Sequence, residues 1–406
     1  PTCPSCGGDI RISRYHCPSC DISVEGAFER NRFSRLSPQG QDFLILFVKN
    51  RGNLREIERE LDKQWKENGI TPSEPATSLE WVRRVYLRLI GRVPTKVELD
   101  RFGTVAQSGE QRSKIVDTLL YGDQYKTAFT QHWTTVWTNT LIGRQGGLGT
   151  DNANREGLQQ YLSESLSANK PYDKMVYELI AAEGAAADTS EHFNGAVNFL
   201  LASLTKNDTP LATSRISSIF LGQKLQCAQC HHHPTSDVAQ GHFWELDAFL
   251  SQLSTTKVDG EFLLADTATG GIKTPDGRTG VYYERPDGVA RIAFPSFLGH
   301  TPTDLNDSSS TSNRRTQLAR LTSQSPLLAR TLVNRMWDHF LGYGFTTSVD
   351  DMGPHLPVSH PQLLEMLSRQ TESVDYDLKQ VMKWIVLSDP FSRSSKYSTS
   401  NDIDSP

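Results

Sequence analysis

The sequence lacks several features that would place it in a familiar class of protein. Its 406 residues contain no apolar run long enough to cross a bilayer, so we expect no membrane span. The net charge of −5 at pH 7 excludes a basic field over the whole chain, although a local basic patch for nucleic acid is still compatible with it. A P-loop, a GxSxG elbow and an HExxH motif are also absent, and we therefore do not expect an enzyme of those classes.

Cysteine is sparse, and its spacing is restrictive. The six cysteines form three CxxC pairs, which are Cys3/Cys6, Cys17/Cys20 and Cys227/Cys230. Disulfide frameworks of secreted domains rarely use this pattern, whereas metal sites, haem attachment sites and redox dithiols do. The sequence therefore indicates metal, haem or redox chemistry at two places in the chain.

The first two cysteine pairs have the arrangement of a zinc ribbon. Ten residues separate the two CxxC units, and each unit supplies two thiolates for one tetrahedral Zn²⁺. So short a segment buries little apolar surface, and the metal would have to stabilise its fold. We expect one structural, closed zinc site made by Cys3, Cys6, Cys17 and Cys20. Two cysteine pairs without metal are the alternative.

Apolar periodicity predicts a mainly α fold, with a small zinc ribbon at the N-terminus and a small β-rich insertion. The chain is long enough for two or three domains. The expected parts are a zinc ribbon (1–26), two helices (27–62), a helical body (63–253), a β-hairpin and loop insertion (254–310) and a second helical part (311–398).

Two stretches of the body have clear helical signals. SLEWVRRVYLRLI places Trp81, Val85 and Leu89 on one face and should end at Gly91. GHFWELDAFLSQL, residues 241–253, repeats apolar residues at helical spacing. We also expect helices through 96–142, 155–186 and 208–226.

The third cysteine pair lies between helical stretches and is followed by histidine. LQCAQCHHHP contains Cys227, Cys230 and His231 in the CxxCH order of covalent haem attachment. In such a site each thiol adds across a haem vinyl group, and the next histidine ligates the iron. The sixth iron ligand is left open, with His232, His233, His242, His132 or a methionine as candidates by residue type.

Other interpretations of this stretch compete with haem. Cys227, Cys230, His231 and His233 together form a donor set that suits Zn²⁺ or a similar metal. A thioredoxin-like dithiol would require a βαβ context, which the helical flanks do not provide. Structural cysteines that bind neither haem nor metal are the remaining alternative.

The N-terminal segment resembles domain of unknown function 2089, a zinc ribbon joined to a helix-turn-helix. The resemblance rests on CPSCGGDI, YHCPSCDISVEGAF and FSRLSPQGQDFLILFVKNRGNLREIEREL, and spans residues 3–61. The recognition helix that should follow is missing, since the sequence continues as KQWKENGITPSEP. The resemblance thus implies a zinc ribbon with a truncated helix-turn-helix, and nucleic acid as a partner for this segment alone.

The body resembles the cytochrome-c-like domain of unknown function 1549 of planctomycetes. The carrying residues are RRVYLRLIGRVPT, FTQHWTTVW, NKPYDKMVYELIAAEG and FLGQKLQCAQCHHHP, within about 61–253. The stretch from LARLTSQSPLLARTL to HPQLLEMLS resembles its usual companion, domain of unknown function 1553, over about 283–398. This family implies an exported protein with haem c on Cys227, Cys230 and His231, and it places His233 at a second family histidine.

The companion domain carries the motif NRxWxH. Arg335 and His339 stand four residues apart, and on a helix they share one face. That face is compatible with haem propionates or an acidic partner. The competing interpretation is a structural network in which Arg335 pairs with Asp350 or Asp351.

These features lead to one functional prediction with alternatives. We expect an electron-transfer or redox subunit that carries haem c and a structural zinc, with a redox protein or an exported enzyme as partner. The alternative is a metal-stabilised binding module associated with polysaccharide or a partner enzyme, with or without a DNA-binding N-terminus. The family implies an exported or periplasmic location for the body, whereas a chain without a preceding signal would be cytoplasmic.

Overall fold

A computed structural model describes residues 12–16, 23–28, 73–144, 152–204, 208–258, 260–267, 270–299 and 313–396. The chain divides into two compact units. The first comprises residues 1–70 with 359–363, and the second comprises 71–358 with 364–406.

The first unit contains a two-stranded antiparallel sheet. Strand β1 (Ile12–His16) pairs with β2 (Ser23–Phe28), and the register shifts between Ile12 and Arg14. The zinc ribbon that the sequence predicts covers residues 1–26, so this hairpin lies largely within it. The four expected zinc ligands and the two helices expected over 27–62 lie outside the described residues.

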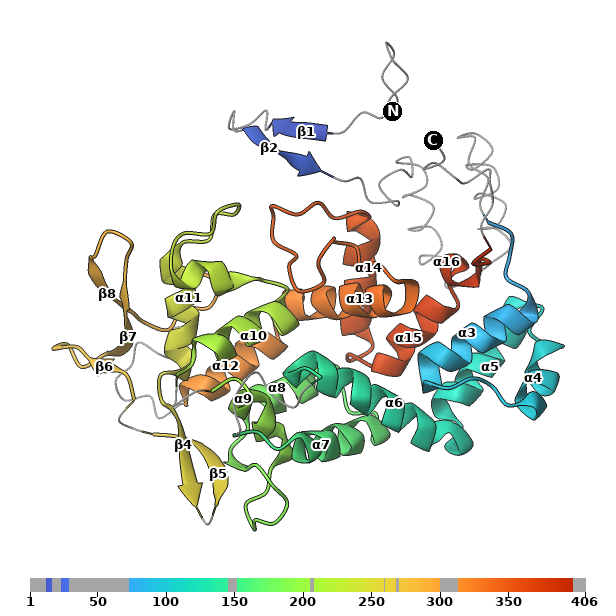
Figure 1. The fold of residues 1–406 in the computed structure, drawn as a ribbon, viewed down its shortest axis with the longest axis horizontal. Helices are drawn as coiled ribbons and strands as arrows, with labels where there is room; N and C mark the ends of the chain where they lie inside the picture. The colour runs from blue at the N-terminus through green and yellow to red at the C-terminus, as the bar shows by residue number, and fades with distance from the viewer. Residues whose placement is uncertain are drawn as a thin grey trace. The chain divides into compact units, whose positions relative to one another are not determined.

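The second unit is built mainly from helices (Figure 1), as the sequence predicts. They are α3 (Ser78–Ile90), α4 (Lys96–Gly103), α5 (Gly109–Tyr121), α6 (Asp123–Ile142), α7 (Arg155–Ser167), α8 (Tyr172–Ala181), α9 (Asn198–Leu201), α10 (Pro210–Leu221), α11 (Gln240–Asp247), α12 (Arg314–Ser323), α13 (Pro326–Leu341), α14 (Pro361–Ser373), α15 (Leu378–Val386) and α16 (Asp389–Ser392). None of the described helices is long and apolar enough to cross a membrane.

Helix α3 shows how local sequence sets these elements. The Thr77 hydroxyl accepts a hydrogen bond from the backbone N–H of Glu80 and so caps the first turn. The helix ends at Gly91, whose φ of 70° is the left-handed conformation that glycine adopts without strain. Its inner face buries Trp81 and Leu89, in agreement with the sequence prediction.

The β-rich part is larger than the single hairpin expected from sequence. One three-stranded antiparallel sheet has the order β3 (Gly184–Ala185), β5 (Glu261–Asp266), β4 (Leu253–Val258). A second has the order β6 (Ile272–Lys273), β7 (Thr279–Glu284), β8 (Ala290–Ala293). The helical stretch expected to reach residue 186 ends at Ala181, because residues 184–185 pair with β5 instead.

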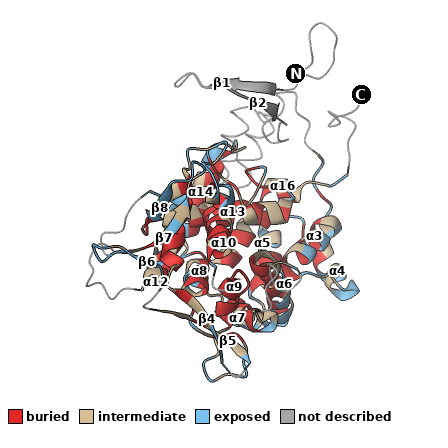
Figure 2. Ribbon diagram, turned by 60° about the vertical axis from the view of Figure 1, so that its left-hand side comes forward, coloured by how far each residue is buried: buried red, intermediate tan, exposed pale blue. Residues whose placement is uncertain are grey.

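The core of the second unit lies on α6, α8, α9, α10 and α13. Figure 2 shows buried residues gathered on these helices. Every residue of α9 is buried, and Trp133, Trp137 and Phe129 of α6 are among the largest fully buried side chains. Large aromatic groups contribute most of the apolar surface removed from water in such a core.

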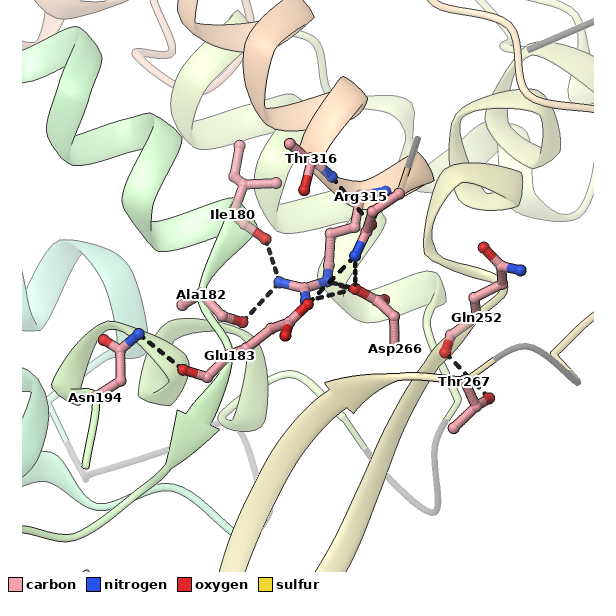
Figure 3. Close-up of polar contacts among 10 residues, drawn as sticks. Ile180, Ala182, Glu183, Asn194, Gln252, Asp266, Thr267, Arg315 and Thr316 are labelled. Carbon is pink, nitrogen blue, oxygen red and sulfur yellow. Dashed lines mark hydrogen bonds and ion pairs between the residues drawn. The ribbon is translucent and has the colours of Figure 1, made fainter. Parts of the chain in front are cut away.

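A buried arginine joins α12 to the rest of the unit (Figure 3). The fully buried guanidinium of Arg315 is held against the carboxylate of Asp266 on β5, with Nη2–Oδ2 at 2.6 Å. Its Nη1 donates to the carbonyl oxygens of Ile180 and Ala182 at the end of α8. A buried cation is tolerated only when it is paired and hydrogen-bonded, so these contacts fix α12 against α8 and β5.

Candidate thiol–imidazole site

The CxxCH stretch lies on a short turn that follows α10, and residues 225–231 are called the thiol turn below. Helix α10 ends at Gly222, whose φ is 61°, and a 3₁₀ turn, η3 (Leu225–Gln229), comes next. Leu225 and Ala228 face the core, whereas Cys227 and Cys230 are exposed and not joined in a disulfide. Cys227 lies within the turn and Cys230 is the residue that ends it, and both are exposed to solvent.

The turn is held in place by α11 and β7. The carbonyl oxygen of Gln229 accepts hydrogen bonds from Trp244 Nε1 at 3.0 Å and from Gln240 Nε2 at 3.3 Å. The Trp244 ring stacks on Tyr283, with centroids 5.9 Å apart and planes 11° from parallel. A packed framework therefore presents the two cysteines, although the cysteines themselves face water.

His231 has one ring nitrogen occupied and the other available. Its Nδ1 lies 2.7 Å from the carbonyl oxygen of His232 and donates to it, since a carbonyl only accepts. That bond selects the tautomer with the lone pair on Nε2, the arrangement found in many metal-ligating histidines. The side chain is exposed, and its Nε2 has no hydrogen-bond partner among the described residues.

His233 packs against a second histidine, which the sequence analysis did not single out. The rings of His233 and His355 are 5.0 Å apart, and His355 Nε2 donates to Asp351 Oδ2 at 3.2 Å. Burial lowers the pKa of His233, and the neighbouring His355 lowers it further. The surroundings of the His233 ring thus include the segment that carries Asp351 and His355.

That segment reaches the thiol turn from the companion region of the sequence. The backbone N–H of Met352 donates to the carbonyl oxygen of Gly222 at 2.7 Å. Arg335 Nη2 donates to Asp350 Oδ1 at 2.5 Å and to the carbonyl oxygen of Ile219 at 3.3 Å. Arg335 therefore makes the carboxylate pair that the structural interpretation of its motif anticipated, with Asp350 as the partner.

The remaining histidine candidates are dispersed. The ring nitrogens of His232 and His242 accept backbone N–H groups near the start of α11. His132 lies on α6, with its ring 6.2 Å from that of His339 on α13. The sequence could not separate these histidines, because their residue type is the same and only tertiary packing distinguishes their surroundings.

The turn carries the three residues of the CxxCH motif, Cys227, Cys230 and His231. Both thiols are free and accessible, and the imidazole that follows them directly has no Nε2 partner among the residues that the structure describes. Within the described ranges, no group of three or more His, Cys, Asp or Glu side chains is placed to hold a metal ion.

Comparison with protein families divides the chain into three segments. Residues 56–255 match PSCyt2, a protein of unknown function (DUF1549), and residues 314–405 match PSD1, a protein of unknown function (DUF1553). Residues 3–34 match the DUF2089 zinc ribbon, which is shorter than the resemblance over 3–61 expected from sequence. Searches of curated proteins and of solved structures give no match.

Proposed function

Since the chain carries a DUF2089 zinc ribbon, a DUF1549 segment and a DUF1553 segment in that order, we propose that it is a haem-carrying electron-transfer subunit. Cys227 and Cys230 would hold haem c through thioethers, and His231 would ligate the iron through Nε2. The bound group would supply one-electron transfer. The partner would be a redox protein or an exported enzyme.

One observation carries this proposal. The two free thiols and the unoccupied Nε2 of His231 all lie on one exposed turn, whose backbone is fixed by Trp244 and Gln240. A disordered loop would have to lose conformational entropy before it could hold a rigid group. A turn already anchored to α11 avoids most of that cost, and the exposed thiols can be reached by a large planar reactant.

The neighbouring residues have supporting roles in this proposal. His233, whose depressed pKa keeps its ring neutral near pH 7, lies beside the turn together with His355. Cys3, Cys6, Cys17 and Cys20 would bind one structural zinc within the ribbon match. We further propose the part boundaries 1–26, 27–62, 63–253, 254–310 and 311–398, and an exported location.

The test is to export the full chain, behind an added signal peptide, from a bacterium that has the c-haem maturation machinery. The wild-type chain should gain the mass of one haem, show a reduced α-band and retain colour through acid-acetone extraction. The double variant C227S/C230S should be colourless. H231M should keep the added mass and change the spectrum, because both thioethers form while the iron loses its imidazole.

The control variant is H192A, which removes an exposed histidine elsewhere and should leave mass and spectrum unchanged. An unmodified mass, in cells that load another c-type cytochrome, would reject haem attachment. Metal analysis of the same sample should give one zinc per chain. Two zinc ions per chain without haem would instead favour the metal-stabilised binding module.

A further inference from the structure

The histidines around the thiol turn differ in which ring nitrogen carries the proton. A metal binds imidazole through a nitrogen lone pair, which a neutral ring has only on the nitrogen without a proton. A hydrogen bond at one ring nitrogen therefore decides whether the other can bind a metal. His231 Nδ1 donates to the carbonyl oxygen of His232 at 2.7 Å, so the lone pair of His231 is on Nε2.

Two histidines at the start of α11 have the opposite arrangement. His232 Nδ1 accepts the backbone N–H of Gln240 at 3.3 Å. His242 Nδ1 accepts the backbone N–H of Ala239 at 3.3 Å. Since a backbone N–H only donates, both rings hold their proton on Nε2. A shift of either proton would also leave unpaired a backbone donor that the helix itself does not satisfy.

His233 and His355, which pack against each other, present no accessible lone pair either. His233 Nδ1 accepts the backbone N–H of Thr235 at 3.3 Å, so its proton is on Nε2 as well. His355 Nε2 donates to Asp351 Oδ2 at 3.2 Å, and the lone pair then lies on Nδ1, which is buried. Of the five imidazoles at and beside the turn, that of His231 alone combines a lone pair on Nε2 with an exposed side chain.

Methionine sulfur is the other side-chain ligand that commonly faces a histidine in c-type haems. Three of the five methionines are at most 1% exposed, namely Met175, Met336 and Met382. Met352 lies next to Gly222, where a Cβ atom would meet its sulfur at 3.1 Å. Met352 is therefore the side chain that a test must compare with the histidines.

We propose that, when haem c is attached at the thiol turn, His231 is the sole protein ligand of the iron and the opposite axial position is open to a small external ligand. This inference rests on the proposed haem attachment and adds a class of ligand to it. The class comprises carbon monoxide, nitric oxide, cyanide and similar small molecules that donate an electron pair to iron. The ligands and the access around a haem iron decide between ligand binding and electron transfer alone. The protein would thus bind such a ligand in addition to transferring electrons.

The experiment uses the full chain exported from cells with the c-haem machinery, in which intact mass first confirms one haem. Carbon monoxide is then added to the dithionite-reduced protein, and the Soret band is recorded. We expect a broad reduced α-band and a saturable Soret shift that ends at one CO per haem. A c-type cytochrome with two protein ligands, loaded in the same cells, should show no shift.

The variants H232A, H233A, H242A and M352L identify any competing side chain. If one of these side chains ligated the iron, its replacement would raise the affinity for CO at least about tenfold, because CO would no longer have to displace it. We expect no such rise in any of the four. The inference is overturned if the loaded wild-type protein shows no CO shift, or if one variant binds CO at least about tenfold more tightly. An unmodified mass would reject both haem attachment and this inference.

Discussion

At the scale of single residues, the buried carboxyl of Asp247 couples stability to pH. Asp247 is 2% exposed and accepts hydrogen bonds from the hydroxyls of Thr213 and Thr209 on or next to α10. Burial raises the pKa of this carboxyl to about 6, well above its ordinary value of 3.8. Between these two values the folded state binds more protons than the unfolded state, so stability falls as the pH rises through this range.

We therefore predict that D247N flattens this pH dependence. At pH 8 the variant should be more stable than wild type by up to about 3 kcal/mol, because each pKa unit corresponds to about 1.4 kcal/mol. Below pH 4 the two proteins should be equally stable. Urea unfolding between pH 4 and pH 8 measures the difference, with D188N at an exposed position as control. A wild-type stability that rises over this range would contradict the burial argument.

At the scale of elements, glycine ends α10 where the thiol turn begins. A Cβ atom at Gly222 would lie 2.9 Å from Thr331 Oγ1 and 3.1 Å from Met352 Sδ. Gly342 ends α13 in the same left-handed region, with φ at 88°, but a Cβ atom there would meet nothing within 4 Å. Alanine substitutions at Gly342 and Gly222 therefore separate the cost of backbone strain from the cost of steric crowding.

We predict that G342A lowers the free energy of unfolding by about 1 kcal/mol, the cost of left-handed alanine. G222A should cost at least about 1 kcal/mol more, because a buried side chain must also move. Urea unfolding of both variants at one pH tests this. Equal losses in the two variants would show that the packing of Thr331 and Met352 around Gly222 is loose.

The elements differ in how far sequence could predict them. Helix α3 was predictable because its cap, its apolar spacing and its terminal glycine are local signals. Strand β3 was not predictable, because two residues are too few to show a periodicity and they form a strand only by pairing with β5. The sequence predicted Asp350 or Asp351 as the partner of Arg335, and the structure shows Asp350. His355 was missed, because its contact with His233 depends on tertiary packing.

At the scale of the whole second unit, Arg315 joins segments that belong to different parts of the sequence. The residue falls within the DUF1553 match, whereas Ile180 and Ala182 fall within the DUF1549 match and Asp266 lies between the two. We predict that R315M lowers the free energy of unfolding by about 3–5 kcal/mol, since it leaves the largely buried Asp266 carboxylate without its cation.

The control for this prediction is R320M, on the exposed face of the same helix, which should change stability by less than about 0.5 kcal/mol. R315K should lie between the two, because it keeps the charge but cannot reproduce the bonds to both carbonyl oxygens. Denaturant unfolding at neutral pH gives the order of the three variants. A loss in R315M no larger than that in R320M would mean that the cluster does not hold the segments together.

The hydrogen bond from Met352 to Gly222 links the thiol turn to the downstream segment of the chain. The carbonyl oxygen of Gly222, just before the cysteine-bearing turn, accepts this bond from the downstream segment. The ring of His233 also packs against His355 of that segment. Severing the polypeptide between the two segments would leave the turn anchored on α11 but without these two contacts. A gene cut short before the DUF1553 segment would therefore encode the CxxCH motif without the downstream contacts to Gly222 and His233.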